Sequence, residues 1–438
     1  MVKIRMASCT KILRSARCYG LSLLVLLLSL VAAKANAQTS ESAQTPIAID
    51  ALVAEAMRSN PEIAGARSHW QGTTRVPQQM GTLDDPQVFV QEFTVGSPAP
   101  GSGYETSDFY YTGFGFSQDI PGPGKLRLRE QRAQKDSDYA HANLESVERR
   151  VVEKVRETGL NLFYLTRVGD LLEGTRADLQ TVDQGAKEQY RTGMAQQQDV
   201  LKAQLAATTI MKDSEMNRGD IAATEASLKA LLGREQDAPD IAIADASPTS
   251  FNLPEARLGD AADVGSADLK MARATLAGSK DALDLARHDY WPDFSLGYQY
   301  NKTGPGFRDY YMLTVGAKIP LYFWRKQTPA VEQAAEEKQS AESQLRAARL
   351  SAVSDLRSAA VEARSHEHII SLYRDGLIPQ AESTLSSATA AYRTGKVDFQ
   401  TLLSAVIDLL NLREGYYRAV ADHEIAVARV KQIIGEQS

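Results

Sequence analysis

The sequence predicts an α+β membrane protein that is internally duplicated, with two pairs of β-strands and two very long helical hairpins. Three observations indicate this fold class. The 16 prolines leave two long gaps, one between Pro123 and Pro239 and one after Pro379, and such gaps favour long helices. Aromatic residues gather near 89–116 and 290–324, where polarity alternates as it does in strands. The same order of elements also occurs twice along the chain.

Residues 1–37 are predicted to form a signal peptide that is removed on export. An apolar run from Leu21 to Ala33 is followed by the small-x-small cleavage pattern Ala35-Asn36-Ala37. The run of about 13 residues is shorter than the roughly 20 that a membrane-spanning helix needs. Basic residues precede it, at Lys3, Arg5, Lys11, Arg14 and Arg17.

Removal of this segment changes the chemistry available to the mature chain. It takes away six basic residues and no acidic ones, so the net charge changes from −6 to −12. Binding to nucleic acid then has no electrostatic basis. Both cysteines, Cys9 and Cys18, are lost as well, which excludes a disulfide, a thiolate metal site and a cysteine nucleophile. No later stretch has 18 consecutive apolar residues, so we expect no transmembrane helix.

Internal matches define the duplication. The segment Tyr190-Arg191-Thr192-Gly193 recurs as Tyr392-Arg393-Thr394-Gly395, at an offset of 202. Ala66-Arg67 recurs as Ala272-Arg273 at an offset of 206, and Ile120-Pro121 as Ile319-Pro320 at an offset of 199. We therefore predict one structural unit at 38–236, a proline-containing linker at 237–262 and a second unit at 263–438.

The first unit is expected to begin with a helix at 60–82. Asn60-Pro61-Glu62 is a good start for it, since proline is favoured at the first helical position. A Gly/Pro/Ser-rich loop at 96–103 then separates two strands, and a proline corner precedes a helix whose length is on the order of 100 Å. The expected ranges are strands 87–95 and 108–120, corner 121–124, long helix 125–190, tip near 191–195 and partner helix 196–232.

The second unit repeats this order. In its first strand, Phe294 and Tyr300 are expected to face lipid, while Ser295, Gln299 and Asn301 face water. The expected ranges are helix 265–287, strands 293–301 and 309–319, long helix 328–391, tip near 393–397 and partner helix 398–434.

Four strands of membrane-spanning length cannot close a barrel, because the smallest membrane barrels have eight strands and an open edge in lipid leaves backbone groups unpaired. Several chains must then share one barrel. Three chains would supply twelve strands, and the same assembly would pack the long helices into a hollow cylinder. A soluble β-sandwich hairpin with one buried face is the alternative. The signal peptide, the duplication and the helix lengths favour the barrel.

These features, together with the turn sequence from Tyr190 to Gln204, resemble the TolC-like outer membrane efflux proteins of Gram-negative bacteria over residues 46–435. The stretch from Ser117 to Leu126 is similar to the branch that serves heavy-metal resistance-nodulation-division (RND-type) pumps. The resemblance implies a homotrimer in which a 12-strand outer membrane β-barrel, surrounded by outer membrane lipid, continues into a long periplasmic α-helical barrel. It implies export of heavy-metal cations or small toxic compounds, with a periplasmic membrane fusion (adaptor) protein and an inner-membrane RND-type pump as partners.

The resemblance also assigns the two helix-reversal tips to contact with the adaptor. These residues are Arg191, Thr192, Gly193 and Met194, and Arg393, Thr394, Gly395 and Lys396. Glycine permits the left-handed turn that reverses a helix, so a plain turn is the alternative. Some family members close the entrance with aspartates past the second tip, where this chain has Thr401 and Ser404. Asp199 and Asp398 remain as gate candidates, with surface charge or helix capping as the alternative.

Other motifs favour structure over chemistry. Gly122-Pro123-Gly124-Lys125 lacks the spacing of a phosphate loop and is interpreted as a corner. His366 and His368 are two apart on a helix and point away from each other, so they are poor joint ligands. We predict no catalytic, cofactor-binding or metal site, and no enzyme. A type I protein-secretion exit duct and a periplasmic coiled-coil scaffold remain as alternative functions.

Overall fold

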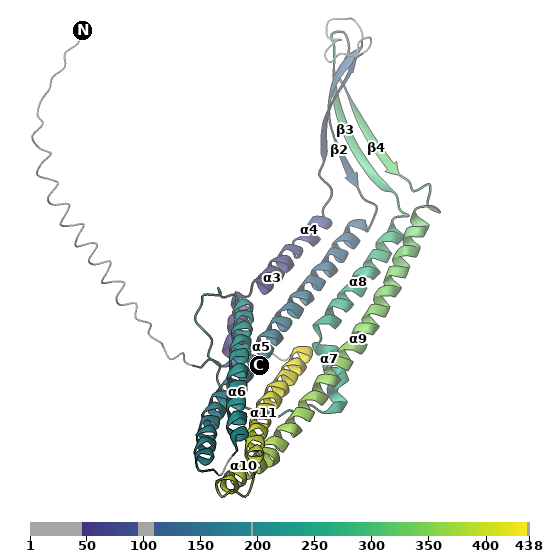
Figure 1. Cartoon of the computed structure of the whole chain (residues 1–438). Coiled ribbons are helices and arrows are strands. Elements are labelled where there is room, and N and C mark those ends of the chain that lie inside the picture. The colour runs from purple at the N-terminus through teal and green to yellow at the C-terminus, as the bar shows by residue number, and fades with distance from the viewer. Residues whose placement is uncertain (1–45, 95–108, 194–195, 436–438) are drawn as a thin grey trace, which may run out of the picture. The chain divides into compact units, whose positions relative to one another are not determined.

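The computed structural model describes residues 46–94, 109–193 and 196–435, and its helices and strands belong to the unit Ile47–Ser438. The predicted signal peptide 1–37, the loop 96–103 and the tip residue Met194 lie outside the described residues. Within this unit the strands lie at one end of the helices, and the two helix reversals lie at the other (Figure 1).

The four strands form one antiparallel sheet in the order β1-β2-β3-β4, which confirms the prediction of four strands per chain. Their bounds are Gln87–Thr94 for β1, Tyr110–Ile120 for β2, Asp293–Thr303 for β3 and Tyr310–Lys318 for β4. Because β2 pairs with β3, the hairpins of the two halves lie side by side in one sheet. Within the described residues, the outer strands β1 and β4 each pair on one side only. The sheet therefore has two open edges.

The apolar face of the sheet is exposed, but its polar face is partly covered. Phe294 and Tyr300 are exposed, as expected for the outward face. Gln299 and Asn301, which we expected to face water, are only 4% and 0% exposed, so this expectation is wrong. They lie over Gly113, where a Cβ atom would stand 2.1 Å from the Gln299 amide nitrogen. The missing side chain makes the room that buries them, and Gln299 donates a hydrogen bond to Asn301 at 2.7 Å.

The start of the first half differs from the single helix expected at 60–82. The structure has α2 at Ile49–Ser59, α3 at Pro61–Thr73 and α4 at Val76–Met80. Asn60 caps α3, since its side-chain oxygen accepts from the backbone N–H groups of Glu62 and Ile63. The break before α4 has a local cause: Pro77 has no N–H with which to continue α3, and it instead occupies the first turn of a new helix.

The long helix α5 spans Lys125–Arg191 and has 67 residues, which corresponds to a length of roughly 100 Å. Its partner α6 spans Gln197–Leu232. Toward the sheet, α5 packs against α3, α4 and α8, and beyond them against α6 and α11. Among the described helices, none is both long and apolar enough to cross a membrane.

The second long helix, expected to be continuous over 328–391, is interrupted. The structure has α9 at Gln327–Leu372, a π-helical turn at Tyr373–Leu377 and α10 at Ile378–Arg393, followed by α11 at Phe399–Ile434. Pro379 explains the interruption, because it has no N–H to donate to the carbonyl four residues earlier. The widened turn ends two residues before this proline and accommodates the missing bond.

The linker at 237–262 is less irregular than expected. A short 3-10 helix at Glu255–Arg257 leads into α7, Leu258–Gly265, and α8 follows at Ala267–His288. Leu258 and Ala262 are buried against Ala352 and Leu356 of α9. These contacts stabilise α7, which is too short to show a helical pattern in the sequence.

Helix ends meet in the same way in both halves. A Cβ atom on Gly233, just past α6, would stand 2.6 Å from the carbonyl oxygen of Ser59, which precedes the α3 cap Asn60. A Cβ atom on Gly265, which precedes the α8 cap Ser266, would stand 2.1 Å from the carbonyl oxygen of Ile434 at the end of α11. The two caps are 206 residues apart, the offset seen in the sequence. This correspondence supports our proposal that 38–236 and 263–438 are two copies of one unit.

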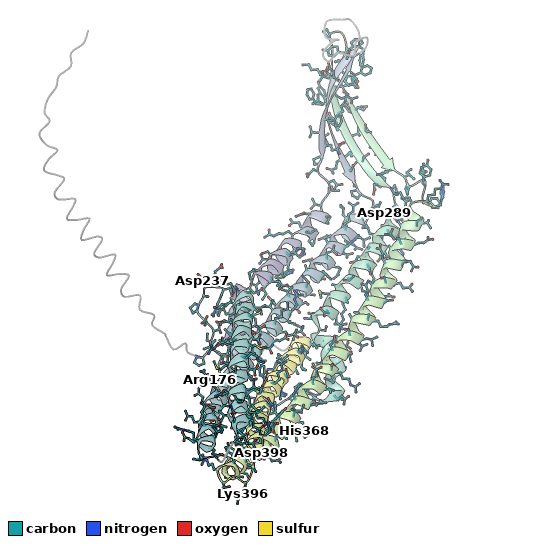
Figure 2. The ribbon with its side chains drawn as sticks, in the orientation of Figure 1. Arg176, Asp237, Asp289, His368, Lys396 and Asp398 are labelled. Carbon is teal, nitrogen blue, oxygen red and sulfur yellow. The ribbon has the colours of Figure 1, made fainter. Side chains whose placement is uncertain are left out.

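The corner at Gly122-Pro123-Gly124-Lys125 connects the sheet to α5, as interpreted from the sequence. The Lys125 side chain is buried, and its Nζ lies 2.8 Å from Asp293 Oδ1, 3.0 Å from the Trp291 carbonyl oxygen and 3.4 Å from Asp289 Oδ1. Figure 2 labels Asp289 at the sheet end of the helices. Because Lys125 begins the first long helix and Asp293 begins β3, this charged contact fastens the two halves together where helices meet the sheet.

The helix-reversal tips as the candidate functional site

The first tip is a tight reversal between α5 and α6. Thr192 follows the last residue of α5, Arg191, and its hydroxyl donates to the Gln189 carbonyl at 3.0 Å. Gly193 has a φ of 76°, the left-handed conformation expected for it, and its N–H donates to the Tyr190 carbonyl at 3.0 Å. Arg191 forms an exposed ion pair with Glu188 at 3.1 Å. The predicted residues Arg191, Thr192 and Gly193 are therefore together at one exposed end.

The second tip repeats this geometry between α10 and α11. Gly395 has a φ of 69°, and its N–H donates to the Tyr392 carbonyl at 3.0 Å. The hydroxyl of Thr394 donates to the Ala391 carbonyl at 3.0 Å, and the N–H of Lys396 donates to the same carbonyl at 2.9 Å. Arg393 and Lys396 are exposed, so this tip presents two cations to solvent.

The two tips share one small core, so they form a single surface. It contains residues of all four helices: Ala186, Ala203, Ala388, Tyr392, Phe399, Leu402 and Ala405. The sequence repeat did not reveal that the tips differ in this core. Tyr392 is 8% exposed, whereas its counterpart Tyr190 is 49% exposed. The signal was present in the sequence, because Phe399, which packs on Tyr392, replaces Gln197 of the first tip.

At the first tip Tyr190 is not buried as Tyr392 is at the second. The first tip therefore carries a groove of about 470 Å³ between α5 and α6. Tyr190 and Leu201, both exposed, contribute apolar surface to it, and Lys187, Glu188 and Arg191 contribute charge. A groove with an apolar floor and a charged margin has the composition of a protein-binding surface. Sequence reasoning found Arg191 but missed Tyr190 and Leu201.

Both gate candidates cap helices in the single chain. Asp398 precedes α11, and its carboxylate accepts hydrogen bonds from the hydroxyl and the N–H of Thr401. These bonds hold the pKa of Asp398 below its ordinary value, with a smaller contribution from Lys202. Asp199 lies in the first turn of α6 and accepts from the Gln196 N–H at 3.2 Å, which completes a capping box. Burial of the hydroxyl raises the pKa of Tyr392, and the negative charge of Asp199 raises it further.

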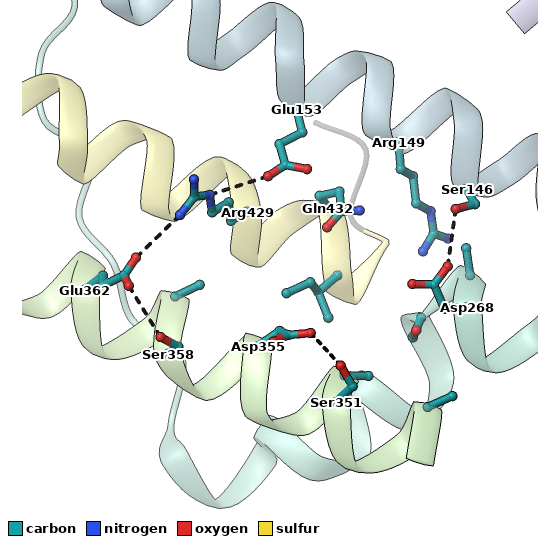
Figure 3. Close-up of a pocket in the computed structure, with 16 residues that line it drawn as sticks. Ser146, Arg149, Glu153, Asp268, Ser351, Asp355, Ser358, Glu362, Arg429 and Gln432 are labelled. Carbon is teal, nitrogen blue, oxygen red and sulfur yellow. Dashed lines mark hydrogen bonds and ion pairs between the residues drawn. The ribbon is translucent and has the colours of Figure 1, made fainter. Parts of the chain in front are cut away.

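A separate polar cavity of about 510 Å³ lies where α11 ends and α8 begins (Figure 3). Arg429 of α11 reaches Glu153 of α5 at 3.5 Å and Glu362 of α9 at 3.7 Å. Burial raises the pKa of Glu153 above its ordinary value, while Arg429 opposes this shift. Since these charges are paired with one another across three helices, we interpret the cavity as part of the helix packing.

The histidines are placed structurally. His366 and His368 lie on α9, the first partly buried and the second exposed. His423 of α11 is fully buried, with its ring nitrogens 2.9 Å from the Ala363 carbonyl oxygen and 2.7 Å from that of Thr249. Throughout the part of the chain that the structure describes, no three His, Cys, Asp or Glu side chains gather closely enough to hold a metal ion.

Comparison with known proteins finds a family model that matches most of the chain and one curated relative. The model of the outer membrane efflux protein family matches residues 22–234 and 258–436. An outer membrane protein TolC of Vibrio cholerae is 25% identical over 354 residues, which cover 76% of this chain and 78% of the relative.

Solved structures share the fold at low sequence identity. One is CusC, described in a study of folding and transmembrane channel formation, with a TM-score of 0.76 and 16% identity over 89% of this chain and 92% of the other. The outer membrane protein VceC of Vibrio cholerae has a TM-score of 0.75 and 17% identity over 88% of this chain and 96% of the other.

Proposed function

Because the chain belongs to the outer membrane efflux protein family, we propose that it is the outer membrane channel-tunnel of a tripartite efflux system. In this role it passively conducts heavy-metal cations or small toxic compounds from the periplasm to the exterior. The observation that carries the proposal is a four-stranded sheet with two open edges, joined to a helix of 67 residues.

The open edges lead to a homotrimer. An edge strand in lipid must find a partner, because its unpaired backbone groups cost several kcal/mol each. Pairing β4 of one copy with β1 of the next, three times over, gives a closed barrel of twelve strands. The strands have 8 to 11 residues, close to the length that crosses a membrane at a tilt. The exposed aromatic face then lies against outer membrane lipid, and the helices extend into the periplasm.

The tips are the proposed docking surface for the periplasmic adaptor protein, which connects the channel to an inner-membrane RND-type pump. They lie at the end of the helices opposite the sheet, which is the end that faces the inner membrane in this arrangement. The groove at the first tip supports an end-on contact, because Tyr190 and Leu201 offer apolar surface to a partner and Arg191 adds charge.

The cargo is the finer part of the proposal. Resemblance of the Ser117–Leu126 stretch to the heavy-metal branch supports cations. The net charge of −12 after signal removal supports them further, since an acidic duct attracts cations electrostatically.

Deletion of the gene tests this function. We expect the deletion strain to become sensitive to heavy metals or to small toxic compounds, and a plasmid copy of the gene to restore tolerance. Growth should be profiled across both classes, with a secreted-protein assay in parallel. Unchanged tolerance to metals would count against the metal branch, and loss of a secreted protein alone would favour a type I secretion duct. Recovery of the protein in the soluble periplasm would contradict the channel.

Asp199 and Asp398 are our candidates for a ring of carboxylates that gates the periplasmic entrance. Asp398→Asn separates this role from capping, because asparagine caps a helix as well as aspartate does but carries no charge. A charged gate predicts a lower single-channel cation conductance for Asp398→Asn in planar bilayers, because the variant loses the carboxylates that attract cations, at an unchanged melting temperature. The control Asp398→Ala removes both charge and cap, at a cost of about 1 kcal/mol in stability. Wild-type conductance in both variants would leave Asp398 with the capping role alone.

A further inference from the structure

A cluster of large apolar side chains stands exposed where the sheet meets the helices. It consists of the end of β4 and the β4–α9 connection, together with the α8–β3 connection beside it. We call it the aromatic platform: Tyr290, Trp291, Ile319, Leu321, Tyr322, Phe323 and Trp324. Leu321 is 67% exposed, Tyr322 70% and Trp291 60%. So much exposed apolar surface in one place marks an interaction site.

The platform is already built in the single chain. The N–H groups of Arg325 and Lys326 both donate to the Tyr322 carbonyl, at 3.0 and 3.1 Å, and so fix the turn. The ring of Phe323 packs edge-on against Trp324 at 5.2 Å and lies 6.3 Å from the ring of Tyr290. The hydroxyl of Tyr290 lies 2.8 Å from that of Thr328, at the start of α9. A rigid aromatic surface binds a partner without losing much conformational entropy.

Two cations follow the platform directly. Arg325 and Lys326 are both exposed, and within the described residues neither forms an ion pair with an acidic side chain. Their charges are therefore available to an anionic partner. They are the two residues that follow Trp324, so charge and aromatic surface belong to the same turn.

The position of the platform favours lipid over protein. Along β4 the exposed side chains Tyr311, Leu313 and Val315 form the outward face, and Ile319 continues it into the platform. The proposed function places that face against acyl chains and the helices in the periplasm, so the platform lies at the inner leaflet. Tryptophan and tyrosine are enriched at this depth of a bilayer, and lysine and arginine extend to the headgroups.

We propose, building on the proposed function, that the platform lies in the headgroup region of the inner leaflet and that Arg325 and Lys326 bind the phosphates of anionic phospholipids there. Aromatic belts mark the bilayer interfaces of membrane β-barrels in general. The proposal specific to this chain is that the two cations select anionic over zwitterionic lipid. The occupant is a phospholipid headgroup held at a membrane surface, with no role for free phosphate.

The test measures lipid preference in the intact oligomer. Full-length protein is extracted from the outer membrane and titrated with phosphatidylglycerol or phosphatidylcholine, and bound lipids are counted by native mass spectrometry. We expect the wild type to prefer phosphatidylglycerol, and Arg325→Gln/Lys326→Gln to lose on the order of tenfold of that preference. The matched control Lys302→Gln/Arg308→Gln removes two exposed cations near the β3–β4 turn, at the other end of the sheet, and should keep the preference. Inorganic phosphate should not displace the bound lipid.

A second measurement reports depth. The chain has 3 tryptophans, so Trp70→Phe/Trp291→Phe leaves Trp324 as the sole tryptophan, which can be excited selectively at wavelengths that tyrosine does not absorb. In vesicles of phosphatidylglycerol and phosphatidylcholine, quenchers attached near the headgroup should quench Trp324 more strongly than quenchers deep in the acyl chains.

The outcomes distinguish this inference from the function on which it rests. An equal loss of preference in both double variants, or displacement by inorganic phosphate, would overturn the headgroup assignment. Loss of the oligomer in Trp324→Ser, with lipid preference unchanged, would make the platform a contact between copies. Wild-type protein recovered from the soluble periplasm would instead overturn the proposed function itself.

Discussion

Replacing both tip glycines with valine, in Gly193→Val/Gly395→Val, should reduce export to the level of the gene deletion while leaving membrane insertion intact. Both glycines are left-handed, with φ values of 76° and 69°, and open space surrounds the position where a Cβ atom would stand. The penalty therefore comes from the backbone, at roughly 1–2 kcal/mol for each non-glycine residue in this conformation. A homotrimer would carry six such tips, so the strain on a shared docking surface is on the order of 10 kcal/mol.

Two controls make this result specific. Gly306→Val is the first control. It places valine at a glycine with a φ of 103° and open surroundings, but in the β3–β4 turn, at the end of the molecule opposite the tips, so export should persist. Gly193→Asn/Gly395→Asn adds a side chain that tolerates the left-handed conformation, so export should be largely retained.

Export is measured as tolerance of the complemented deletion strain, and insertion as a heat-modifiable oligomer in outer membrane extracts. Normal export by the valine variant would show that the tip assignment is wrong. An equal loss of export in the valine and asparagine variants would show that the docking contact has no room for a side chain at these positions, and that backbone strain is not the cause.

The long helices were predictable because their signal is spread over many residues. The proline gap after Pro123 predicted α5 and α6 to within two residues at their ends. The second long helix, expected at 328–391, was predicted less accurately. It contains Pro379, and whether a proline breaks a helix or is accommodated by a π-helical turn is decided locally. Short elements such as α7 were missed, since eight residues show little periodicity and their helix forms against α9.

The candidate site was predictable in position but not in detail. The repeated Arg-Thr-Gly segment located both tips. The capping role of Asp398 was also predictable, because an aspartate that precedes a helix accepts the N–H of the residue three positions later, here Thr401. Which tip has the buried tyrosine was predictable only in part. Phe399 in place of Gln197 indicates the second tip, but Tyr392 is buried in a core that also contains Ala186 of α5 and Ala203 of α6, which come together with it only in the folded chain. The contact between Lys125 and Asp293 was not predictable from the sequence either, because the two residues lie 168 positions apart and meet only after the sheet has formed.

Gly265→Ala should be among the most destabilising single substitutions in the chain. A Cβ atom at this position would stand 2.1 Å from the Ile434 carbonyl oxygen and 2.4 Å from its carbonyl carbon, far inside van der Waals contact. Both obstructing atoms belong to the backbone at the end of α11, so no side-chain rotation relieves the clash. Separating α7 from α11 should cost about 3 kcal/mol or more.

The loss of stability in Gly265→Ala extends beyond the local clash, because Gly265 and its neighbour Ser266 also contact α5 and α8. The Gly265 carbonyl accepts a hydrogen bond from the Arg149 guanidinium of α5, and Ser266 next to it caps α8. A shift of Gly265 therefore disturbs three helices at once: α5 through Arg149, α8 through its cap Ser266, and α11, whose last residue contacts Gly265. A lost hydrogen bond to a charged group adds about 1.5–3 kcal/mol.

Gly259→Ala is the matched control, since Gly259 lies in the same helix and nothing stands within 4 Å of the position of its Cβ atom. Alanine should be neutral there or stabilise the helix by up to about 1 kcal/mol. The melting temperature of the detergent-solubilised oligomer measures both variants. We expect a clear decrease for Gly265→Ala and none for Gly259→Ala. Equal melting temperatures would mean that α7 and α11 are farther apart than the structure places them, and that the end-on junction does not bear on stability.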